Sequence, residues 1–335
     1  MIPRTDLAWQ TPSWQQQLAG AFTRAEDLFD YLELDPSLLP AARSAANKFG
    51  LRVPAAYAAR IERGNPKDPL LLQVLPVDRE LKEAIGFDTD PVQDKKSVTA
   101  PGVLHKYGGR ALLIATGTCG IHCRYCFRRH FPYADSGIGR DRWQQALTYL
   151  QQTDQIKEII LSGGDPLILS DDRLAALIDA LQQIPHLQRL RIHSRLPVII
   201  PDRLTDRLTE LMASQRLLTT LVLHVNHARE ISDPLVAALN RIRSRGVTLL
   251  NQSVLLRGVN DTAETLCELS EALFSSGTLP YYLHLLDRVQ GAAHFEVPED
   301  EALRLHQRIR LRLPGYLLPR LVRDTPGAQS KTLLG

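Results

Sequence analysis

Three of the four cysteines in the chain lie within eight positions. They are Cys119, Cys123 and Cys126, and the segment that holds them reads Thr-Cys-Gly-Ile-His-Cys-Arg-Tyr-Cys-Phe-Arg. Thiolates at this C-x-x-x-C-x-x-C spacing lie on one tight loop and can ligate three irons of a four-iron cluster. The fourth iron then keeps an open position, which a catalytic metal centre needs in order to bind its substrate or cofactor directly. The spacing therefore predicts an iron–sulfur site.

Two other interpretations of the cysteines remain open at this point. A structural zinc ion would use the three cysteines with His122 or His130, and buried cysteines that bind nothing are also compatible with the spacing. Zinc loops usually pair C-x-x-C elements from two separate segments, and this chain offers no second pair. The fourth cysteine, Cys267, stands alone in a helix-like segment, where a free thiol packs as a small hydrophobic group.

A second segment with chemical potential is the run Leu-Ser-Gly-Gly-Asp-Pro-Leu, which includes Ser162, Gly163, Gly164 and Asp165. Two adjacent glycines allow the backbone to approach a ligand closely. An acidic side chain beside them can accept hydrogen bonds from an ammonium group. Taken alone, the pattern fits an ordinary turn equally well.

The elements around these residues follow a regular rhythm that begins at Arg110. Short apolar runs alternate with longer amphipathic segments at a spacing of roughly 30 residues, which predicts parallel strands joined by right-handed helical crossovers. The fold class is therefore α/β, and a partial (β/α)6 barrel is preferred over an open doubly wound sheet. In either architecture the active site lies at the carboxyl ends of the strands. The predicted strands cover 111–116, 158–162, 190–193, 219–224, 248–254 and 281–286, and the predicted helices cover 141–152, 171–184, 203–214, 234–244 and 263–275.

We divide the chain into three regions. Residues 1–104 form a mainly helical accessory region, with helices expected around 14–32 and 38–49. Residues 105–315 form the barrel, and residues 316–335 form a short C-terminal segment.

The composition excludes several classes of protein. The net charge of +3 comes from 40 basic and 37 acidic side chains that are spread along the 335 residues, so no basic cluster of the kind that nucleic acid requires stands out. The first residues lack the apolar core of a signal peptide, and no stretch reaches the roughly 20 apolar residues of a membrane span. We therefore expect a cytoplasmic protein with no nucleic-acid or membrane partner.

The cysteine motif, followed by an aromatic residue and placed after the first strand of a βα repeat, resembles the radical S-adenosylmethionine (SAM) superfamily. From 105 to 332 the chain is similar to the lysine 2,3-aminomutase family within it. The resemblance implies a [4Fe-4S] cluster on the three cysteines, SAM on the free iron, and an external electron donor that starts the radical reaction. It also implies that Ser162, Gly163, Gly164, Asp165, His224 and Gln252 line the SAM site.

The same resemblance implies a second cofactor, pyridoxal 5'-phosphate (PLP). Lys331 takes the position of the lysine that holds PLP covalently, and Arg110 that of the arginine that pairs with its phosphate. The preceding turn, Gly-Ala-Gln-Ser, departs from the mostly glycine turn of the family. Without the resemblance, Lys331 would be interpreted as a solvated tail residue and Arg110 as a surface residue at a strand edge.

The substrate implied by the family is lysine, which is converted to β-lysine. Its α-carboxylate needs a cation and its distant ε-ammonium needs anionic partners. The family positions for these groups are occupied here by Arg128, by Asp287 and by Asp324. An aminomutase that acts on glutamate would need neutral or basic residues at the two aspartate positions, and a non-catalytic iron–sulfur or zinc protein would have no use for Lys331.

Length separates two branches of the family. The fermentative enzymes continue into a cysteine-bearing segment that binds zinc, whereas this sequence stops at Gly335. The short form resembles the bacterial type that supplies β-lysine for elongation factor P, to which a ligase similar to lysyl-tRNA synthetase attaches it.

Overall fold

The computed structural model of the protein describes residues 12–133, 140–213 and 216–335. Its centre is a single curved sheet of ten strands, in the order β1-β2-β3-β4-β5-β6-β7-β8-β9-β10. Six neighbouring strands are parallel and alternate with helices, as the sequence rhythm predicts. They are β3 (Arg110–Thr116), β4 (Glu158–Gly163), β5 (Arg189–Ser194), β6 (Leu218–Leu223), β7 (Thr248–Val254) and β8 (Leu279–His284).

The order of the strands decides between the two architectures considered above. A doubly wound sheet reverses its strand order at a switch point, whereas here each strand pairs with the next one along the chain. Among the described strands, β1 and β10 at the two ends of the sheet are not paired with each other. The fold is therefore a partial barrel with six βα-type units.

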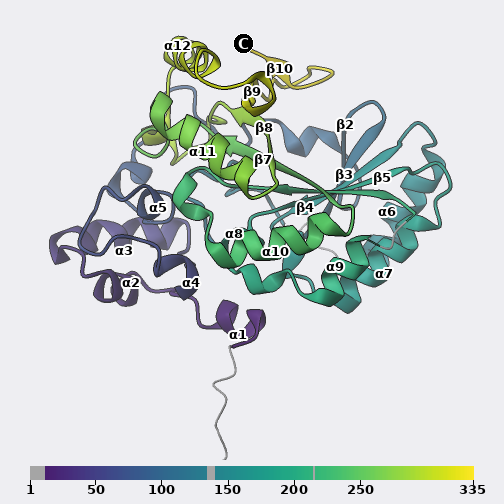
Figure 1. Ribbon diagram of the computed structural model, residues 1–335, viewed down its shortest axis with the longest axis horizontal. Helices are drawn as coiled ribbons and strands as arrows, with labels where there is room; N and C mark the ends of the chain where they lie inside the picture. Colours follow the sequence, from purple (N-terminus) through teal and green to yellow (C-terminus); the bar gives the residue numbers. More distant parts are fainter. Residues whose placement is uncertain (1–11, 134–139, 214–215) are drawn as a thin grey trace, which may run out of the picture.

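Helices cover the outer face of this barrel (Figure 1). The crossover helices are α6 (Arg140–Gln152), α7 (Asp171–Gln182), α8 (Leu196–Ile199), α9 (Asp206–Ala213), α10 (Asp233–Ser244) and α11 (Ala263–Ser275). The predicted helix at 203–214 starts later than expected, because Pro201 opens a 3₁₀ turn that ends at Arg203. The last residue of that prediction, Ser214, lies outside the described residues.

Short helices from the N-terminal part of the chain pack at one side of the barrel (Figure 1). The segment expected to be helical at 14–32 is interrupted after Gly20, and Phe22 makes a β-bridge with Val53 instead. The helix expected at 38–49 runs from Leu39 to Lys48. The helices of this part are α1 (Trp14–Ala19), α2 (Ala25–Leu32), α3 (Leu39–Lys48), α4 (Ala55–Ala58) and α5 (Pro69–Leu72).

Antiparallel strands flank the parallel ones at both ends of the sheet. β1 (Val98–Ala100) and β2 (Val103–Tyr107) precede β3, while β9 (Arg320–Arg323) adds in parallel to β8 and pairs antiparallel with β10 (Thr332–Leu333). Helix α12 (Glu299–Arg310) connects β8 to β9. The proposed boundary between 104 and 105 falls inside β2, and the division into three regions stays a prediction.

Successive side chains along a strand point alternately into the hydrophobic core and into the cavity inside the barrel. In β5, for example, Leu190 and Ile192 are buried, whereas Arg191 and His193 line the cavity inside the barrel. This is the period of two that a pleated strand imposes. The largest hydrophobic core is one cluster whose side chains come from positions as far apart as Trp14 and Leu273. The N-terminal helices therefore share it with the barrel. In the described part of the chain no helix is long and apolar enough to cross a membrane.

Candidate active site

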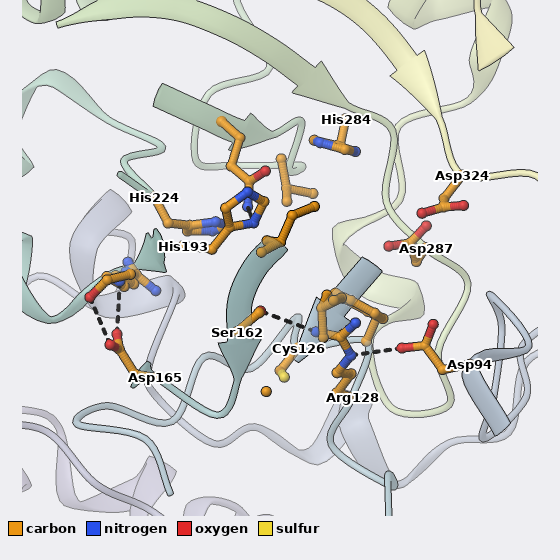
Figure 2. A pocket seen from close by; sticks show the side chains of 18 of the residues that line it. Asp94, Cys126, Arg128, Ser162, Asp165, His193, His224, His284, Asp287 and Asp324 are labelled. Atoms are coloured by element: carbon orange, nitrogen blue, oxygen red, sulfur yellow. Dashed lines mark hydrogen bonds and ion pairs between the residues drawn. The ribbon is translucent and has the colours of Figure 1, made fainter. Parts of the chain in front are cut away.

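One cavity of about 290 Å³ lies inside the barrel at the carboxyl ends of its strands. Every residue that the resemblance assigns to the cluster, the cofactors or the substrate lines it, although these residues are spread over more than 200 positions of the chain. Figure 2 shows several of them. The set comprises Arg110, Cys119, Cys123, Cys126, Arg128, Ser162, Gly163, Gly164, Asp165, His224, Gln252, Asp287, Asp324 and Lys331.

The three clustered cysteines enter the cavity on the loop that follows β3. Burial raises the pKa of the Cys126 thiol to about 11 and also raises that of Cys119, so neither is readily deprotonated without a nearby positive charge. The guanidinium of Arg195 donates a hydrogen bond to the sulfur of Cys123 at 2.7 Å. A bound iron ion supplies the positive charge that stabilises thiolates.

No group of three or more His, Cys, Asp or Glu side chains in the described chain is arranged to hold a single metal ion. The thiolates of a four-iron cluster bind different irons, so a cluster does not need sulfurs that meet at one point.

A buried ion-pair network attaches the cysteine loop to the N-terminal part of the chain. The guanidinium of Arg124 pairs with both carboxylate oxygens of Glu80, at 2.8 and 2.6 Å. It also donates to the carbonyl oxygens of Phe49 and Gly50. Arg129 adds a contact of 2.8 Å to the same carboxylate. Because charged groups buried without partners are costly, this network holds the loop in one position.

The two glycines at the end of β4 lie against the backbone that leads into the cysteines. A Cβ atom on Gly164 would lie only 2.3 Å from the carbonyl oxygen of Thr118. Gly163 has a φ of +114°, and its Cβ would lie 2.6 Å from the carbonyl oxygen of Thr116. The close approach that requires glycine is therefore an approach to the chain's own cysteine loop.

The carboxylate of Asp165 is fully occupied by donors of the chain itself. One oxygen accepts from the Ser194 hydroxyl at 2.7 Å and from the Leu167 N–H at 3.0 Å. The other accepts from the N–H groups of Arg195 and Leu196, at 2.8 and 2.9 Å. A carboxylate offers about four acceptor sites, so this arrangement does not support the expected direct contact between Asp165 and an ammonium group. It fixes the start of α8 at the cavity wall instead.

The two polar residues expected at the SAM site, His224 after β6 and Gln252 on β7, line the cavity together with two further imidazoles, those of His193 and His284. The Nε2 atom of His224 lies 3.0 Å from the Tyr125 hydroxyl, and burial lowers the pKa of His224 to about 3. Gln252 Nε2 lies 3.4 Å from Nδ1 of His193. Burial also lowers the pKa of His193 and of His284, so all three imidazoles are neutral at physiological pH.

Two of these imidazoles provide a test of whether the cavity suits a polar cofactor. The Nε2 atoms of His193 and His284 are buried and have no hydrogen-bond partner among the residues that the structure describes. Both side chains line the cavity (Figure 2). Buried polar atoms without partners cost roughly 1–3 kcal/mol each, which a polar ligand in the cavity would recover. The residues present therefore fit cofactors with hydrogen-bonding groups.

Lys331 and the two expected aspartates lie together on the side of the barrel formed by β8 and β9. The Nζ atom of Lys331 is 3.0 Å from Oδ2 of Asp324, whose Oδ1 accepts from the Tyr107 hydroxyl at 2.9 Å. Burial acts to raise the pKa of Asp324, but Lys331 and Lys106 outweigh it and hold that pKa below its usual value. Burial raises the pKa of Asp287 to about 7.

Arg128 points into the cavity between the cysteines and these acids (Figure 2). Its Nε donates to the Asp94 carboxylate at 2.7 Å, and its Nη1 lies 3.4 Å from the Ser162 hydroxyl. Arg110 lines the cavity deeper in the barrel, and its guanidinium lies 4.7 Å from the centre of the Tyr107 ring.

Several residues that line the cavity were not predicted from the sequence. Arg191 and His193 could have been predicted, since they alternate with buried residues along β5 and both face inward. Asp94 could not have been predicted, because it begins a single 3₁₀ turn (Asp94–Ser97) before β1, which is too short to show a periodic pattern. The others that carry chemistry are Lys106, Tyr107, Arg195, Tyr281, Tyr282 and His284.

Comparison with known proteins identifies the family to which the chain is similar. A family model described as the Radical SAM superfamily matches residues 113–270, which run from within β3 through the cysteine loop to within α11.

Curated relatives match almost the whole chain. An L-lysine 2,3-aminomutase of Escherichia coli (strain K12) is 50% identical over 328 residues, which make up 97% of this chain and 96% of that protein. One of Haemophilus influenzae is 46% identical over 99% of this chain and 98% of its own length. One of Clostridium subterminale is 32% identical over 98% of this chain, but the match covers 78% of that protein.

Proposed function

The chain belongs to the lysine 2,3-aminomutase family of radical SAM enzymes, and from this premise we propose that it converts L-lysine to β-lysine. The amino group moves from carbon 2 to carbon 3 of the substrate. The observation that carries the proposal is the content of a single cavity. It holds three cysteines, a lysine, and separate cationic and anionic groups for the two ends of a lysine molecule.

We assign the cofactors to the cavity as follows. Cys119, Cys123 and Cys126 would hold a [4Fe-4S] cluster, and SAM would bind beside it along Ser162, Gly163, Gly164, His224 and Gln252. Lys331 would hold PLP, with Arg110 at its phosphate. When bound, the cluster with SAM supplies the radical that starts the reaction, and PLP carries the migrating amino group.

The substrate is bound at its two ends by opposite charges. Arg128 binds the α-carboxylate, because its terminal nitrogens face the cavity and a planar guanidinium matches a carboxylate in two parallel hydrogen bonds. Asp287 and Asp324 bind the ε-ammonium. Glutamate would bring a second carboxylate to this acidic pair and be repelled, so lysine is favoured over glutamate.

Lys331 and the substrate share one of these acids. In the structure the Lys331 ammonium contacts Asp324 at 3.0 Å. While Lys331 holds PLP its nitrogen is no longer a free ammonium, so this carboxylate would be available to the ammonium of the substrate. Before the cofactor binds, the contact keeps Asp324 ionised and paired.

The proposal is tested by anaerobic incubation of reconstituted enzyme with SAM, PLP, a reductant and either lysine or glutamate. Chromatography of the products should show β-lysine from lysine and no β-amino acid from glutamate. Lys331→Ala and Cys123→Ala should abolish the product. If deoxyadenosine forms without any β-amino acid, the radical chemistry stands and the substrate assignment fails.

Matched control variants distinguish the loss of a cysteine or lysine in the cavity from general destabilisation of the protein. Cys267 lies on α11, outside the cavity, and packs against the core beside it. Lys67 is an exposed lysine in the loop before α5. Cys267→Ala and Lys67→Ala should keep their iron and PLP contents and at least about half of the activity, because conservative changes outside a site usually have small effects.

We further propose that the product serves the modification of elongation factor P, and that the enzyme acts in the cytoplasm. The support is the resemblance to the short bacterial type, together with the match over 96% of the Escherichia coli relative. The partners would be an external electron donor and a ligase similar to lysyl-tRNA synthetase. Incubating the enzyme's product with elongation factor P, the ligase and ATP should add one lysyl mass to the factor, and no addition would contradict this use.

A further inference from the structure

Asp94 lies in the wall of the cavity and holds two cations with one carboxylate. Its Oδ1 is 2.6 Å from Nζ of Lys106, and its Oδ2 is 2.7 Å from Nε of Arg128. The side chain is only 2% exposed, so solvent and salt screen neither pair. The backbone N–H of Asp94 donates to the Asp90 carboxylate at 2.9 Å, which fixes the loop that presents it.

The bond to Asp94 determines which donors Arg128 presents to the cavity. A guanidinium has five N–H donors in a rigid planar fork, and Asp94 uses the one on Nε. Nη1 makes a long contact of 3.4 Å with Ser162, and Nη2 has no hydrogen-bond partner among the described residues. The two terminal nitrogens therefore remain available for a carboxylate, with the fork held in place from behind.

The bond to Lys106 has a different consequence. Lys106 also lines the cavity, and its charge acts to lower the pKa of both Asp287 and Asp324. Its ammonium is chemically the same group as the distant end of a lysine substrate. In the structure this ammonium bonds to Asp94 and to the carbonyl oxygen of Val92, at 2.6 and 2.7 Å, and has no hydrogen bond to Asp287 or Asp324.

We propose that Asp94 is a positioning residue that sets the selectivity of the cavity for a substrate with one carboxylate and one distant ammonium group. It fixes the fork of Arg128 for the carboxylate. It also retains the ammonium of Lys106, which would otherwise compete with the substrate for Asp287 and Asp324. The proposal rests on the proposed function, because it requires these residues to bind lysine.

Asp94→Asn is the first test, because it removes the charge with almost no change in shape. The KM for lysine should rise about tenfold, equivalent to about 1.4 kcal/mol, while kcat falls less than about threefold. Iron and PLP contents should match those of the unchanged enzyme. The control is Asp172→Asn, which removes a carboxylate from an exposed ion pair with Arg207 on the outside of the barrel and should leave KM unchanged.

Two analogues of lysine separate the two parts of the proposal. Norleucine keeps the α-carboxylate and lacks the ε-ammonium, whereas 1,5-diaminopentane lacks the carboxylate and keeps both nitrogens. Asp94→Asn should weaken competitive inhibition by both. Adding Lys106→Met to this variant should restore inhibition by 1,5-diaminopentane and leave inhibition by norleucine weak. A purely structural role for Asp94 would not produce this selective recovery.

Each outcome decides the proposal. An unchanged KM in Asp94→Asn overturns it, and a double variant that binds 1,5-diaminopentane no better than Asp94→Asn overturns the role of Lys106. Loss of PLP from Lys106→Met also overturns that role, because Lys106 would then hold the cofactor. If Asp94→Asn does not fold, Asp94→Ser replaces it. Formation of β-lysine by the unchanged enzyme tests the proposed function separately, so failure of one is distinguishable from failure of the other.

Discussion

At the scale of single residues, Asp287 is a carboxylate that titrates near neutrality. Burial raises its pKa to about 7, and the negative charge of Asp324 adds to this effect, while Lys331 opposes it. The protonated form cannot attract an ammonium group. The proposed substrate site therefore loses part of its negative charge as the pH falls through the range in which most carboxylates stay ionised.

We predict that kcat/KM for lysine decreases below about pH 7, and that the decrease approaches tenfold per pH unit, because this ratio reports the ionisation of the free enzyme. Activity should be retained above that pH, where Asp287 is ionised. The measurement is a pH profile of kcat/KM, with competitive inhibition by norleucine as the control, since norleucine makes no use of the acidic pair. A kcat/KM that stays flat from about pH 5.5 to 8 would contradict the prediction.

Sequence alone identified the residues whose type and position restrict their role. Three cysteines in one tight loop have few alternatives, and residues at the ends of parallel strands must converge. Asp94 and Lys106 could not be found in this way, because a single 3₁₀ turn and an antiparallel flanking strand carry no pattern that predicts a position in the cavity. The sequence also did not show that the Asp165 carboxylate already accepts its full set of hydrogen bonds, because two of the donors are backbone N–H groups that follow the next strand and begin the next helix.

At the scale of elements, the joint between β4 and the cysteine loop is the tightest contact near the site. The Gly164 N–H donates to Thr116 at 2.7 Å, and the Asp165 N–H donates to Thr118 at 2.8 Å. These bonds bring the two backbones too close for a side chain at Gly164. The position of the cysteines therefore depends on a residue that carries no functional group.

We predict that Gly164→Ala lowers the iron content of the purified protein by at least about half and destabilises the fold by about 1–3 kcal/mol, the usual cost of overpacking. The new methyl group must displace the backbone of Thr118, which directly precedes Cys119. Iron analysis and thermal unfolding measure the two effects. Gly315→Ala is the control, because nothing lies within 4 Å of the added atom. An iron content equal to that of the control would refute this account of the joint.

The sequence predicted the barrel elements better than the N-terminal ones. Apolar residues occupy successive or alternate positions along the strands of the barrel, so the strands are recognised with errors of a few residues, as for β8, which starts at Leu279 and ends at His284. The break in the segment 14–32 depends on the bridge from Phe22 to Val53, a contact between distant residues that local periodicity does not report.

At the scale of the whole molecule, the N-terminal helices pack directly onto the barrel. They share a continuous hydrophobic core, and Arg60 links them by polar contacts. Its guanidinium donates to the carbonyl oxygens of Glu230 and Val198, both at 2.7 Å. These carbonyls belong to loops and a helix of the barrel, so their bonds cross between the two regions.

We predict that Arg60→Met lowers the free energy of unfolding by about 2 kcal/mol, because it leaves two carbonyl acceptors without a charged donor. Unfolding should remain a single transition, with the same midpoint by far-UV and near-UV circular dichroism. Arg63→Met, which removes an exposed ion pair with Glu33 and an exposed cation–π contact with Tyr31, should cost no more than about 1 kcal/mol. Two separate transitions in the unchanged protein would show that the regions unfold independently.

The position of Lys331 at the edge of the sheet has a consequence for how the protein ages. Lys331 directly precedes β10, which consists of two exposed residues paired with β9. Amide hydrogens there should exchange with solvent much faster than those of β4 to β7, which have a strand on each side. A protease that cuts this hairpin during such local opening would remove the proposed PLP lysine and spare the cysteines. The product of such damage would be an enzyme that still cleaves SAM but no longer rearranges lysine.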